Sequence, residues 1–250
     1  MDVSEPPPTP RIDVRGLTIA YDGIPAVVNV DLQLQAGSIC GLVGMNGAGK
    51  STLFKALTGF VAPSRGQLRL DGLPVAEAQR RQLVAYVPQS DQVDWQFPIR
   101  VWDVGMMGRY GRMNLLRWPS RHDCQLVRQA LERVDLVDLR DRQIGALSGG
   151  QRKRAFLARA LAQQAGVLLL DEPFTGVDIR TERLIIELLL EQRNQGATVL
   201  IATHDLDAIP SFCDRVVLIN RTVLAYGETA AVFTQDNLLR TFGAAPTASA

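Results

Sequence analysis

A glycine-rich run between a strand pattern and a helix pattern constrains this chain more than any other feature. Ser38 to Val43 has the pattern of a short buried strand, and Leu53 and Leu57 lie four residues apart after the run. The run reads Gly-Met-Asn-Gly-Ala-Gly-Lys-Ser-Thr from Gly44 to Thr52. The order of strand, glycine loop and helix predicts a P-loop, in which backbone N–H groups and a helix N-terminus bind phosphate oxygens.

The residues of this run have different expected roles. Lys50 would reach the β- and γ-phosphates of ATP, Ser51 would supply a hydroxyl to Mg²⁺, and Thr52 would add a phosphate contact. The expected backbone cradle consists of Gly44, Asn46, Gly47, Ala48 and Gly49. The alternative is a flexible glycine-rich turn that binds nothing. The placement of the run between a strand and a helix favours a phosphate site over such a turn.

Two carboxylates follow a second buried strand pattern. Val167 to Asp171 is apolar up to its last residue, and Glu172 comes next. Ligands of open α/β sheets bind at the carboxyl ends of the strands. Asp171 therefore suits Mg²⁺ coordination through water, and Glu172 would polarise a water for in-line attack on the γ-phosphate. Without the P-loop, such a strand end is more often a solvated cap.

A further anion-binding element precedes a long helix pattern. The segment Leu147-Ser-Gly-Gly-Gln151 places Ser148 at a good N-cap position, and Gly149 and Gly150 permit close approach to the backbone. Because the P-loop already provides a phosphate site, it is open which molecule's phosphate this second helix N-terminus would bind. Taken alone, it is merely a capped helix.

The composition narrows the class of partner. The chain has 250 residues, 21% of them charged, with a formal net charge of +1, so no whole-chain field attracts nucleic acid. Apolar stretches such as Leu184 to Leu190 are far shorter than the roughly 20 residues of a membrane span. Residues 1–10 are proline-rich and lack the apolar core of a signal peptide, so we expect a disordered leader and no export.

The cysteines and histidines argue against a bound transition metal. Cys40, Cys124 and Cys213 are odd in number and far apart, which favours reduced cytosolic thiols over disulfides or a zinc site. His122 and His204 are too few for a histidine-rich metal site. If a transition metal takes part in the function of this chain, its recognition must therefore lie in another protein.

The remaining patterns define the arrangement of the chain. Residues 11–34 alternate apolar and polar side chains, as antiparallel strands do, with a turn at Gly23 and Pro25. Residues 67–70 are strand-like, and residues 121–139 and 151–164 read as helices. Strand and helix then alternate at 167–171, 181–194, 199–203 and 205–212, which predicts a parallel sheet with crossover helices.

The motifs together resemble those of ABC transporter ATPases. GMNGAGKST, Gln89 after a strand, LSGGQ, LLLDEP, Asp178 and His204 occur in that family's order and approximate spacing. The resemblance implies an α/β fold: a P-loop core with a parallel sheet, an N-terminal antiparallel β subdomain and an α-helical subdomain inserted at about residues 90–165. The expected single domain covers residues 11–243, with a frayed tail at 244–250.

The resemblance also implies a dimer and several residue roles. Two copies would bind head to tail, so that Ser148, Gly149, Gly150 and Gln151 of one copy meet the nucleotide held by the other. Two ATP molecules would then lie between the subunits. By the same resemblance, Tyr21 would stack on adenine.

The catalytic roles are likewise implied by the resemblance. Gln89 would contact Mg²⁺ and the attacking water. His204 would hold the γ-phosphate and orient that water alongside Glu172. Asp178 would organise the contact between the two sites.

The segment after Gln89 indicates the kind of transporter. Residues 90–111 contain four aromatic residues and two methionines, which suggests a groove for a permease helix; the alternative is core packing. The segment resembles that of manganese, zinc and iron importers that use an extracytoplasmic binding protein. The expected location is the cytoplasmic face of the inner membrane. Arg152, Lys153 and Arg154 stand where polar neutral residues are frequent in the family.

Three other readings remain. The chain could energise transport of a different cargo, act on ribosomes or DNA as a non-transport ABC ATPase, or phosphorylate a small molecule as a P-loop kinase. The second usually has two cassettes or a long coiled coil, and this sequence has neither two cassettes nor sustained heptads. The third leaves LSGGQ unexplained.

Overall fold

The computed structural model describes residues 9–89, 95, 97–114 and 116–243. Most of the expected leader, the tail at 244–250 and part of the segment 90–111 therefore lie outside the described residues. The predicted boundaries of these segments stay predictions.

A six-stranded sheet forms the centre of the molecule, in the order β10-β9-β3-β8-β7-β6. Its strands are parallel except for β10, which runs antiparallel to β9. Every residue of β3, β7 and β8 is buried, as expected for strands that are covered on both faces. The strands are β3 (Ile39–Val43), β6 (Val84–Val87), β7 (Val167–Asp171), β8 (Thr198–Thr203), β9 (Arg215–Asn220) and β10 (Thr222–Glu228).

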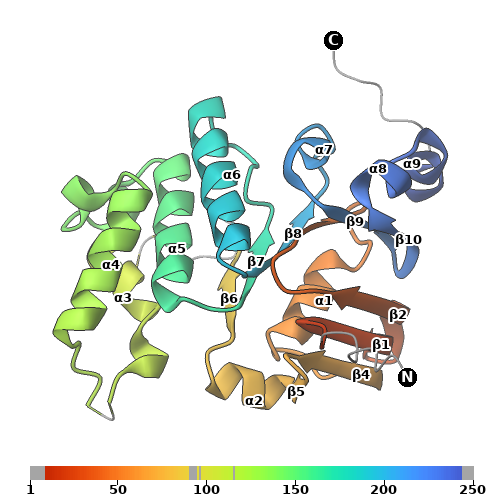
Figure 1. The fold of residues 1–250 in the computed structure, drawn as a ribbon, viewed down its shortest axis with the longest axis horizontal. Coiled ribbons are helices and arrows are strands. Elements are labelled where there is room, and N and C mark those ends of the chain that lie inside the picture. Colours follow the sequence, from red (N-terminus) through yellow and green to blue (C-terminus); the bar gives the residue numbers. More distant parts are fainter. Residues whose placement is uncertain (1–8, 90–94, 96, 115, 244–250) are drawn as a thin grey trace, which may run out of the picture.

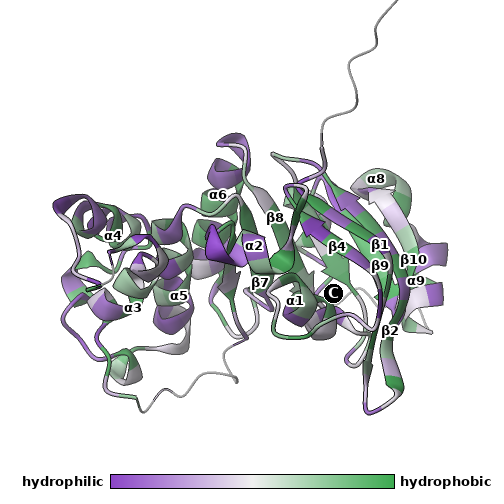
Figure 2. Cartoon of the chain, turned by 90° about the horizontal axis from the view of Figure 1, so that it is seen from below, coloured by the Kyte–Doolittle hydropathy of each residue, from purple (hydrophilic) through white to green (hydrophobic). Residues whose placement is uncertain are grey.

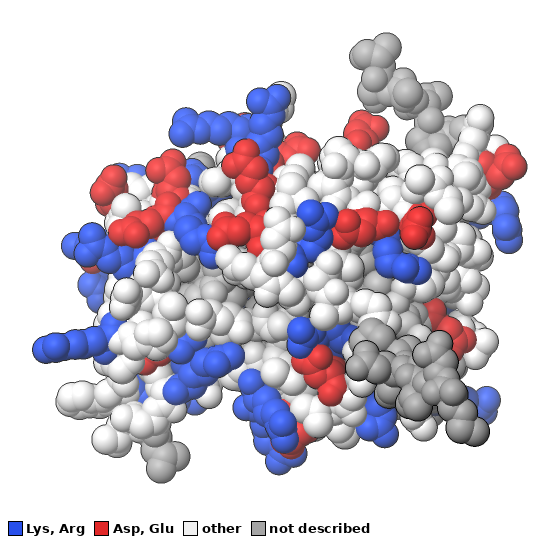
Figure 3. Space-filling model, in the orientation of Figure 1, with Lys and Arg blue, Asp and Glu red and all other residues white. Residues whose placement is uncertain are grey.

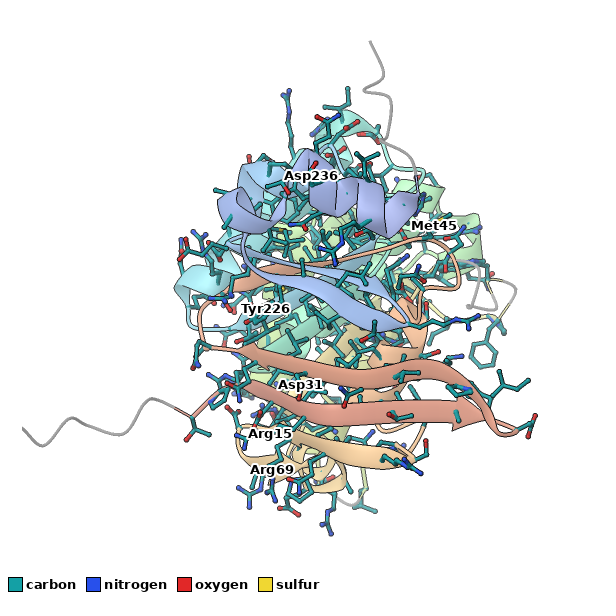
Figure 4. All side chains as sticks on the ribbon, turned by 90° about the vertical axis from the view of Figure 1, so that its right-hand side faces the viewer. Arg15, Asp31, Met45, Arg69, Tyr226 and Asp236 are labelled. Carbon is teal, nitrogen blue, oxygen red and sulfur yellow. The ribbon has the colours of Figure 1, made fainter. Side chains whose placement is uncertain are left out.

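A second, four-stranded sheet of antiparallel strands has the order β2-β1-β4-β5. Its strands are β1 (Ile12–Tyr21), β2 (Ile24–Leu34), β4 (Arg65–Leu70) and β5 (Leu73–Pro74). Alternate residues of β1 and β2 pack into a core shared with α1 and the central sheet. The opposite face is polar, and Figure 4 shows Arg15, Asp31 and Arg69 along it. The antiparallel strands predicted within residues 11–34 are confirmed.

Helices cover the central sheet and form a group of their own. Figure 1 shows α3, α4 and α5 side by side at the end of the molecule away from the antiparallel sheet. The helices are α1 (Lys50–Leu57), α2 (Val75–Arg80), α3 (Val101–Met107), α4 (Arg121–Arg133), α5 (Gly149–Gln163), α6 (Ile179–Asn194), α7 (Ile209–Phe212), α8 (Thr229–Val232) and α9 (Gln235–Phe242). Figure 2 shows the central strands mainly green, whereas outer turns of α4 and α6 are purple. The α/β fold class is confirmed.

A buried ion pair holds the group of three helices together. Arg109, just after α3, donates to Asp123 Oδ1 of α4 at 2.9 Å and to the carbonyl oxygen of Ala162 in α5 at 3.0 Å. Both charged side chains are less than a tenth exposed. The Ser120 hydroxyl and then the Arg109 guanidinium lower the pKa of Asp123 to about 2, so the pair is charged at neutral pH.

Two predicted helices are shorter than the sequence pattern indicated. The helix expected over 121–139 ends at Arg133, because Asp135 adopts a φ of 54°. The helix expected over 205–212 begins only at Ile209. There the Asp205 side chain accepts a hydrogen bond from the N–H of Asp207 at 3.1 Å, a local bond that competes with helix formation.

Candidate active site

The candidate site forms at the carboxyl ends of adjacent parallel strands. In the register of the sheet, Val43 lies beside Thr203, and Asp171 lies beside Ala202. The residues that follow these strands therefore converge at one edge, which is where ligands bind in open α/β folds. This topology brings together segments that are more than a hundred residues apart in the chain.

A cavity of about 250 Å³ lies at this edge. Its lining includes most of the residues that the sequence predicted for nucleotide, Mg²⁺ and catalysis. They are Asn46, Gly47, Ala48, Gly49, Lys50, Ser51, Thr52, Gln89, Asp171, Glu172 and His204, joined by Ala26 and Met45. Met45 is labelled in Figure 4, at the rim of the molecule above the β1–β2 hairpin.

Lys50 lies inside its own loop. Its ammonium donates to the carbonyl oxygens of Gly44 at 2.6 Å and Met45 at 3.3 Å, and the residue is 6% exposed. Burial lowers the pKa of Lys50, and the nearby carboxylates of Glu172 and Asp171 partly offset that effect. A buried cation beside a ring of backbone N–H groups is well suited to phosphate oxygens.

Close packing accounts for two glycines of the loop. A Cβ atom at Gly44 would lie 2.2 Å from the carbonyl oxygen of Ile219 in β9, which leaves no room for a side chain. Gly49 has a φ of +98°, and a Cβ there would lie 2.8 Å from Val27 Cγ2. The loop is therefore held tightly against β2 and the end of β9.

We expect Gly44→Ala to lower the free energy of unfolding by about 1–3 kcal/mol, the usual cost of forcing extra volume into packed structure. For a chain of this size, the melting temperature should fall by roughly 2–4 °C per kcal/mol. Gly149→Ala is the matched control, because a Cβ at Gly149 meets nothing within 4 Å. Thermal unfolding measures both, and equal melting temperatures would contradict the packing argument.

Asp171 and Ser51 bring two side-chain oxygen groups together in the cavity lining. Asp171 is 2% exposed and is hydrogen-bonded by the Ser51 hydroxyl and by Tyr86 Oη, the latter at 3.5 Å. Burial is the main cause that raises the pKa of Asp171, while the Ser51 hydroxyl acts in the opposite direction. Carboxylate and hydroxyl oxygens are the ligands that Mg²⁺ prefers, and a bound cation would offset the cost of the buried charge.

Glu172 is held in an unusual backbone conformation. Its φ is 50°, in the left-handed region, which costs about 1–3 kcal/mol for a residue other than glycine. Its N–H donates to the carbonyl oxygen of Ala202 at 2.9 Å. Such strain is typical of functional sites, where the surrounding structure holds a side chain in a required direction.

Three side chains hold the carboxylate of Glu172. Thr175 and Thr203 donate hydroxyl hydrogen bonds to Oε2 at 3.2 and 3.3 Å, and Nδ1 of His204 lies 2.8 Å from Oε1. Glu172 is 6% exposed, whereas the His204 side chain is 52% exposed. The carboxylate is thus fixed, and the imidazole beside it is half exposed and lines the cavity.

The signature segment lies outside this cavity. Ser148 caps α5 by accepting from the N–H of Gln151 at 3.2 Å, and Gln151 Oε1 accepts from the N–H of Ser148 at 2.9 Å. A Cβ at Gly150 would lie 3.9 Å from Asp178 Oδ2, so the segment adjoins the N-cap of α6. Ser148, Gly149, Gly150, Gln151 and Asp178 thus form a second predicted group, outside the lining of the cavity. Tyr21, at the end of β1, is 41% exposed and also lies outside the cavity lining.

Several residues of the site were missed in the sequence. Ala26 lies in β2, and Tyr86 lies in β6; neither belongs to a recognisable motif, so only the fold could bring them to the site. Thr175 lies three residues after Glu172, and Thr203 directly precedes His204. Their hydroxyls could have been suspected from that proximity alone.

The aromatic segment divides between core and surface. Trp95 packs edge-on against Phe156 of α5, with ring centroids 5.5 Å apart, and Met106 is buried. Phe97 is 61% exposed and Met107 is 43% exposed. Core packing therefore holds for Trp95 and Met106, whereas the groove for a permease helix stays a prediction. Residues 90–94 and 96 lie outside the described part.

The fold and the cavity define a P-loop nucleotide-binding protein. The chain belongs to the ABC transporter family, because the family model described as ABC transporter matches residues 27–175. It is 57% identical to the manganese transport system ATP-binding protein of Synechocystis sp., over 94% of this chain and 91% of that protein. It is 55% identical to a chelated iron transport system protein of Yersinia pestis, over 94% of this chain and 79% of that one.

The names of two more distant relatives also refer to metal transport. The zinc transport system ATP-binding protein of Treponema pallidum is 43% identical over 93% of this chain and 86% of its own length. A solved structure of a putative metal-chelate type ABC transporter in an inward-facing conformation superposes with a TM-score of 0.82 at 30% identity. That match covers 94% of this chain and 89% of the other.

Membership of this family makes the chain a nucleotide-binding ATPase. ABC transporter ATPases work as dimers together with membrane permease subunits. None of the helices in the described part of the chain combines the length and apolarity that a membrane span needs. Nor does any trio of His, Cys, Asp or Glu among the described residues form a candidate metal site.

Proposed function

We propose that this chain is the ATP-hydrolysing subunit of an importer for manganese, zinc or iron, acting at the cytoplasmic face of the inner membrane. The observation that carries hydrolysis is the buried, threonine-held carboxylate of Glu172 beside His204 at the P-loop cavity. The metal cargo is supported by relatives whose names include manganese, iron and zinc transport.

The P-loop cavity suits MgATP. The loop N–H groups and the Lys50 ammonium would bind the phosphates, and Lys50 would exchange its carbonyl contacts for phosphate oxygens. Ser51, Asp171 and Gln89 would hold Mg²⁺, which when bound neutralises charge on the phosphate oxygens. Tyr21 would stack on the adenine, since it lies half exposed outside the phosphate cavity.

Glu172 and His204 would carry out hydrolysis. Glu172 polarises a water for in-line attack on the γ-phosphorus and accepts its proton. His204, whose Nδ1 lies 2.8 Å from the Glu172 carboxylate, would bind a γ-phosphate oxygen and orient the water alongside Glu172. Gln89 also lines this cavity and would contact the same water.

The signature segment would serve a second copy of the chain. The N-terminus of α5 offers free N–H groups and an open approach at Gly149, yet it does not line its own phosphate cavity. A head-to-tail dimer would place this helix end against the nucleotide of the partner. Asp178, beside Gly150, would then lie at the contact between the two sites.

A separate groove suits a permease helix. A hollow of about 550 Å³ is lined by Phe60, Tyr86, Pro88 and Met107 and, between them, by polar residues that include Gln79, Gln82, Arg159 and Gln163. Phe60 is 75% exposed. Exposed aromatic and methionine side chains suit an apolar helix face. Tyr86 also touches Asp171, so the wall of the groove is joined to the hydrolysis site. We place the permease there, along the part of residues 90–111 that includes Met107.

The face of the molecule that Figure 3 presents suits a protein partner better than a polyanion. Figure 3 shows basic and acidic side chains intermixed on the face that it presents, above all over the helices at the upper edge. Such a mixture gives no extended basic stripe on that face for nucleic acid. The ribosome- or DNA-directed alternative therefore has less support than transport.

We expect uptake of one of the three metals to be restored in cells that lack this chain when the wild type is supplied, and not when Glu172→Gln is supplied. Labelled manganese, zinc and iron are scored separately. Restoration of one metal names the cargo and the direction of transport. If no metal responds while the purified chain hydrolyses ATP, the metal assignment is wrong and a different cargo is favoured; phosphate transfer to an acceptor would instead favour a kinase.

A further inference from the structure

A lysine near the N-terminus of α5 holds the backbone segment that bears the catalytic carboxylate. Lys153 is the fifth residue of this helix, two residues after Gln151. Its ammonium donates to the carbonyl oxygen of Glu172 at 3.0 Å and also to the carbonyl oxygen of Thr175. One side chain is therefore hydrogen-bonded to both ends of the Glu172–Thr175 segment. It belongs to α5, which does not line the P-loop cavity.

The backbone conformation of the Glu172–Thr175 segment has to be held by other parts of the protein. Glu172 has left-handed backbone dihedrals, and its N–H is already held by the carbonyl oxygen of Ala202. Lys153 holds the carbonyl oxygen on the other side of the same residue. Because the two bonds fix both peptide units of Glu172, they restrict the direction in which its side chain leaves the backbone.

The second bond acts on the carboxylate more directly. The Thr175 hydroxyl donates to Glu172 Oε2 at 3.2 Å, and Lys153 holds the carbonyl oxygen of that same threonine. Loss of the ammonium would free the threonine together with the backbone of Glu172. The lysine itself does not line the phosphate cavity, so it acts on the reaction only through these residues.

We propose that Lys153 is a positioning residue that sets the Glu172 carboxylate for hydrolysis and links it to the N-terminus of α5. The second part rests on the proposed head-to-tail dimer. In that dimer the α5 N-terminus meets the partner's nucleotide, while Lys153, one turn further along the same helix, holds the Glu172 of its own subunit. Movement of α5 on nucleotide binding at one site would therefore change the carboxylate at the other site.

The neighbouring cations do not share this role. Arg152 donates to the carbonyl oxygen of Gly145 at 2.7 Å and stacks on Trp95, and Arg154 donates to the carbonyl oxygen of Val134 at 2.8 Å. Both contacts tie α5 to other parts of the helical group. Lys153 is the member of this triplet that faces the catalytic segment.

Steady-state hydrolysis by the full-length chain tests the proposal. We expect Lys153→Met to lower kcat by roughly 10-fold and to leave KM for MgATP within about twofold, as for a group that acts on the reaction and not on binding. Lys153→Arg keeps donors for both carbonyls and should restore most of kcat. Lys55→Met is the control, because Lys55 is an exposed lysine of α1 outside the cavity lining.

A double substitution separates positioning from general structural support. If Lys153 acts through the carboxylate, Lys153→Met adds little to the loss already caused by Glu172→Gln in single-turnover hydrolysis. Multiplying losses would overturn the proposal, and so would an unchanged kcat or a raised KM alone in Lys153→Met. If thermal melting shows that Lys153→Met does not fold, Lys153→Gln and Lys153→Arg are compared in its place.

The outcomes distinguish the two levels of inference. An inactive wild type that binds no MgATP would contradict the proposed function itself. An active wild type with an inactive Glu172→Gln and a fully active Lys153→Met would leave the proposed function standing and refute only the role of Lys153.

Discussion

Glu172→Gln should lower the turnover of ATP by about 10²-fold or more, the range that loss of a general base produces. The amide has nearly the shape of the carboxylate but cannot accept the proton of the attacking water. The threonine hydroxyls that now donate to Oε2 can still donate to an amide oxygen, so the segment should keep its conformation. Nucleotide affinity should be retained, and the ATP-bound dimer should accumulate.

Hydrolysis measured as phosphate release, with size-exclusion chromatography in MgATP, tests this expectation. Glu187→Gln is the matched control, because Glu187 is an exposed glutamate of α6 and makes the same change of charge. Turnover that is unchanged in Glu172→Gln would show that another group activates the water. Lost nucleotide binding would mean that the carboxylate supports the cavity rather than the chemistry.

Lys50→Ala should abolish tight binding of nucleotide. The ammonium lies inside the loop, 2.6 Å from the carbonyl oxygen of Gly44, and it is positioned to exchange that contact for phosphate oxygens. Hydrogen bonds to charged groups contribute about 1.5–3 kcal/mol each, so the loss of two predicts a Kd for MgATP raised by roughly 100-fold or more. The buried carboxylates nearby would also lose their cation.

Equilibrium binding of a fluorescent ATP analogue measures this effect, with Lys55→Ala as the control lysine of the same helix. Thermal unfolding without nucleotide checks that the variant folds. Tight MgATP binding by a folded Lys50→Ala would show that the loop does not hold phosphate as argued. Weak binding together with a normal melting temperature would support the assigned role.

The sequence was most informative where function demands a short contiguous motif. Gly44–Thr52 predicted a phosphate loop because strand, glycines and helix must follow one another directly to make it. Asp171 and Glu172 were predicted for a similar reason, since a buried strand has a recognisable end. The α/β fold class followed from the same alternation of strands and helices, and the structure confirms it.

Patterns of weak periodicity were less informative. The strands β9 and β10 and the short helices after them were not predicted, and the helix expected from residue 205 begins at Ile209. Short elements carry few residues from which a period can be measured, and local side-chain bonds such as that of Asp205 outweigh propensity there. The roles assigned to the site residues, among them Tyr21, Gln89 and Asp178, stay predictions.

The sequence by itself determined the phosphate loop, the two carboxylates and the capped signature helix, because each is local in the chain. Only the tertiary structure decided which side chains hold Glu172, since Lys153, Thr203 and His204 reach it from other elements. Such contacts depend on the order of strands in the sheet and on how α5 packs, and neither is encoded in a local run of residues. The sequence thus identified the groups that we propose to react, whereas the fold set their orientation.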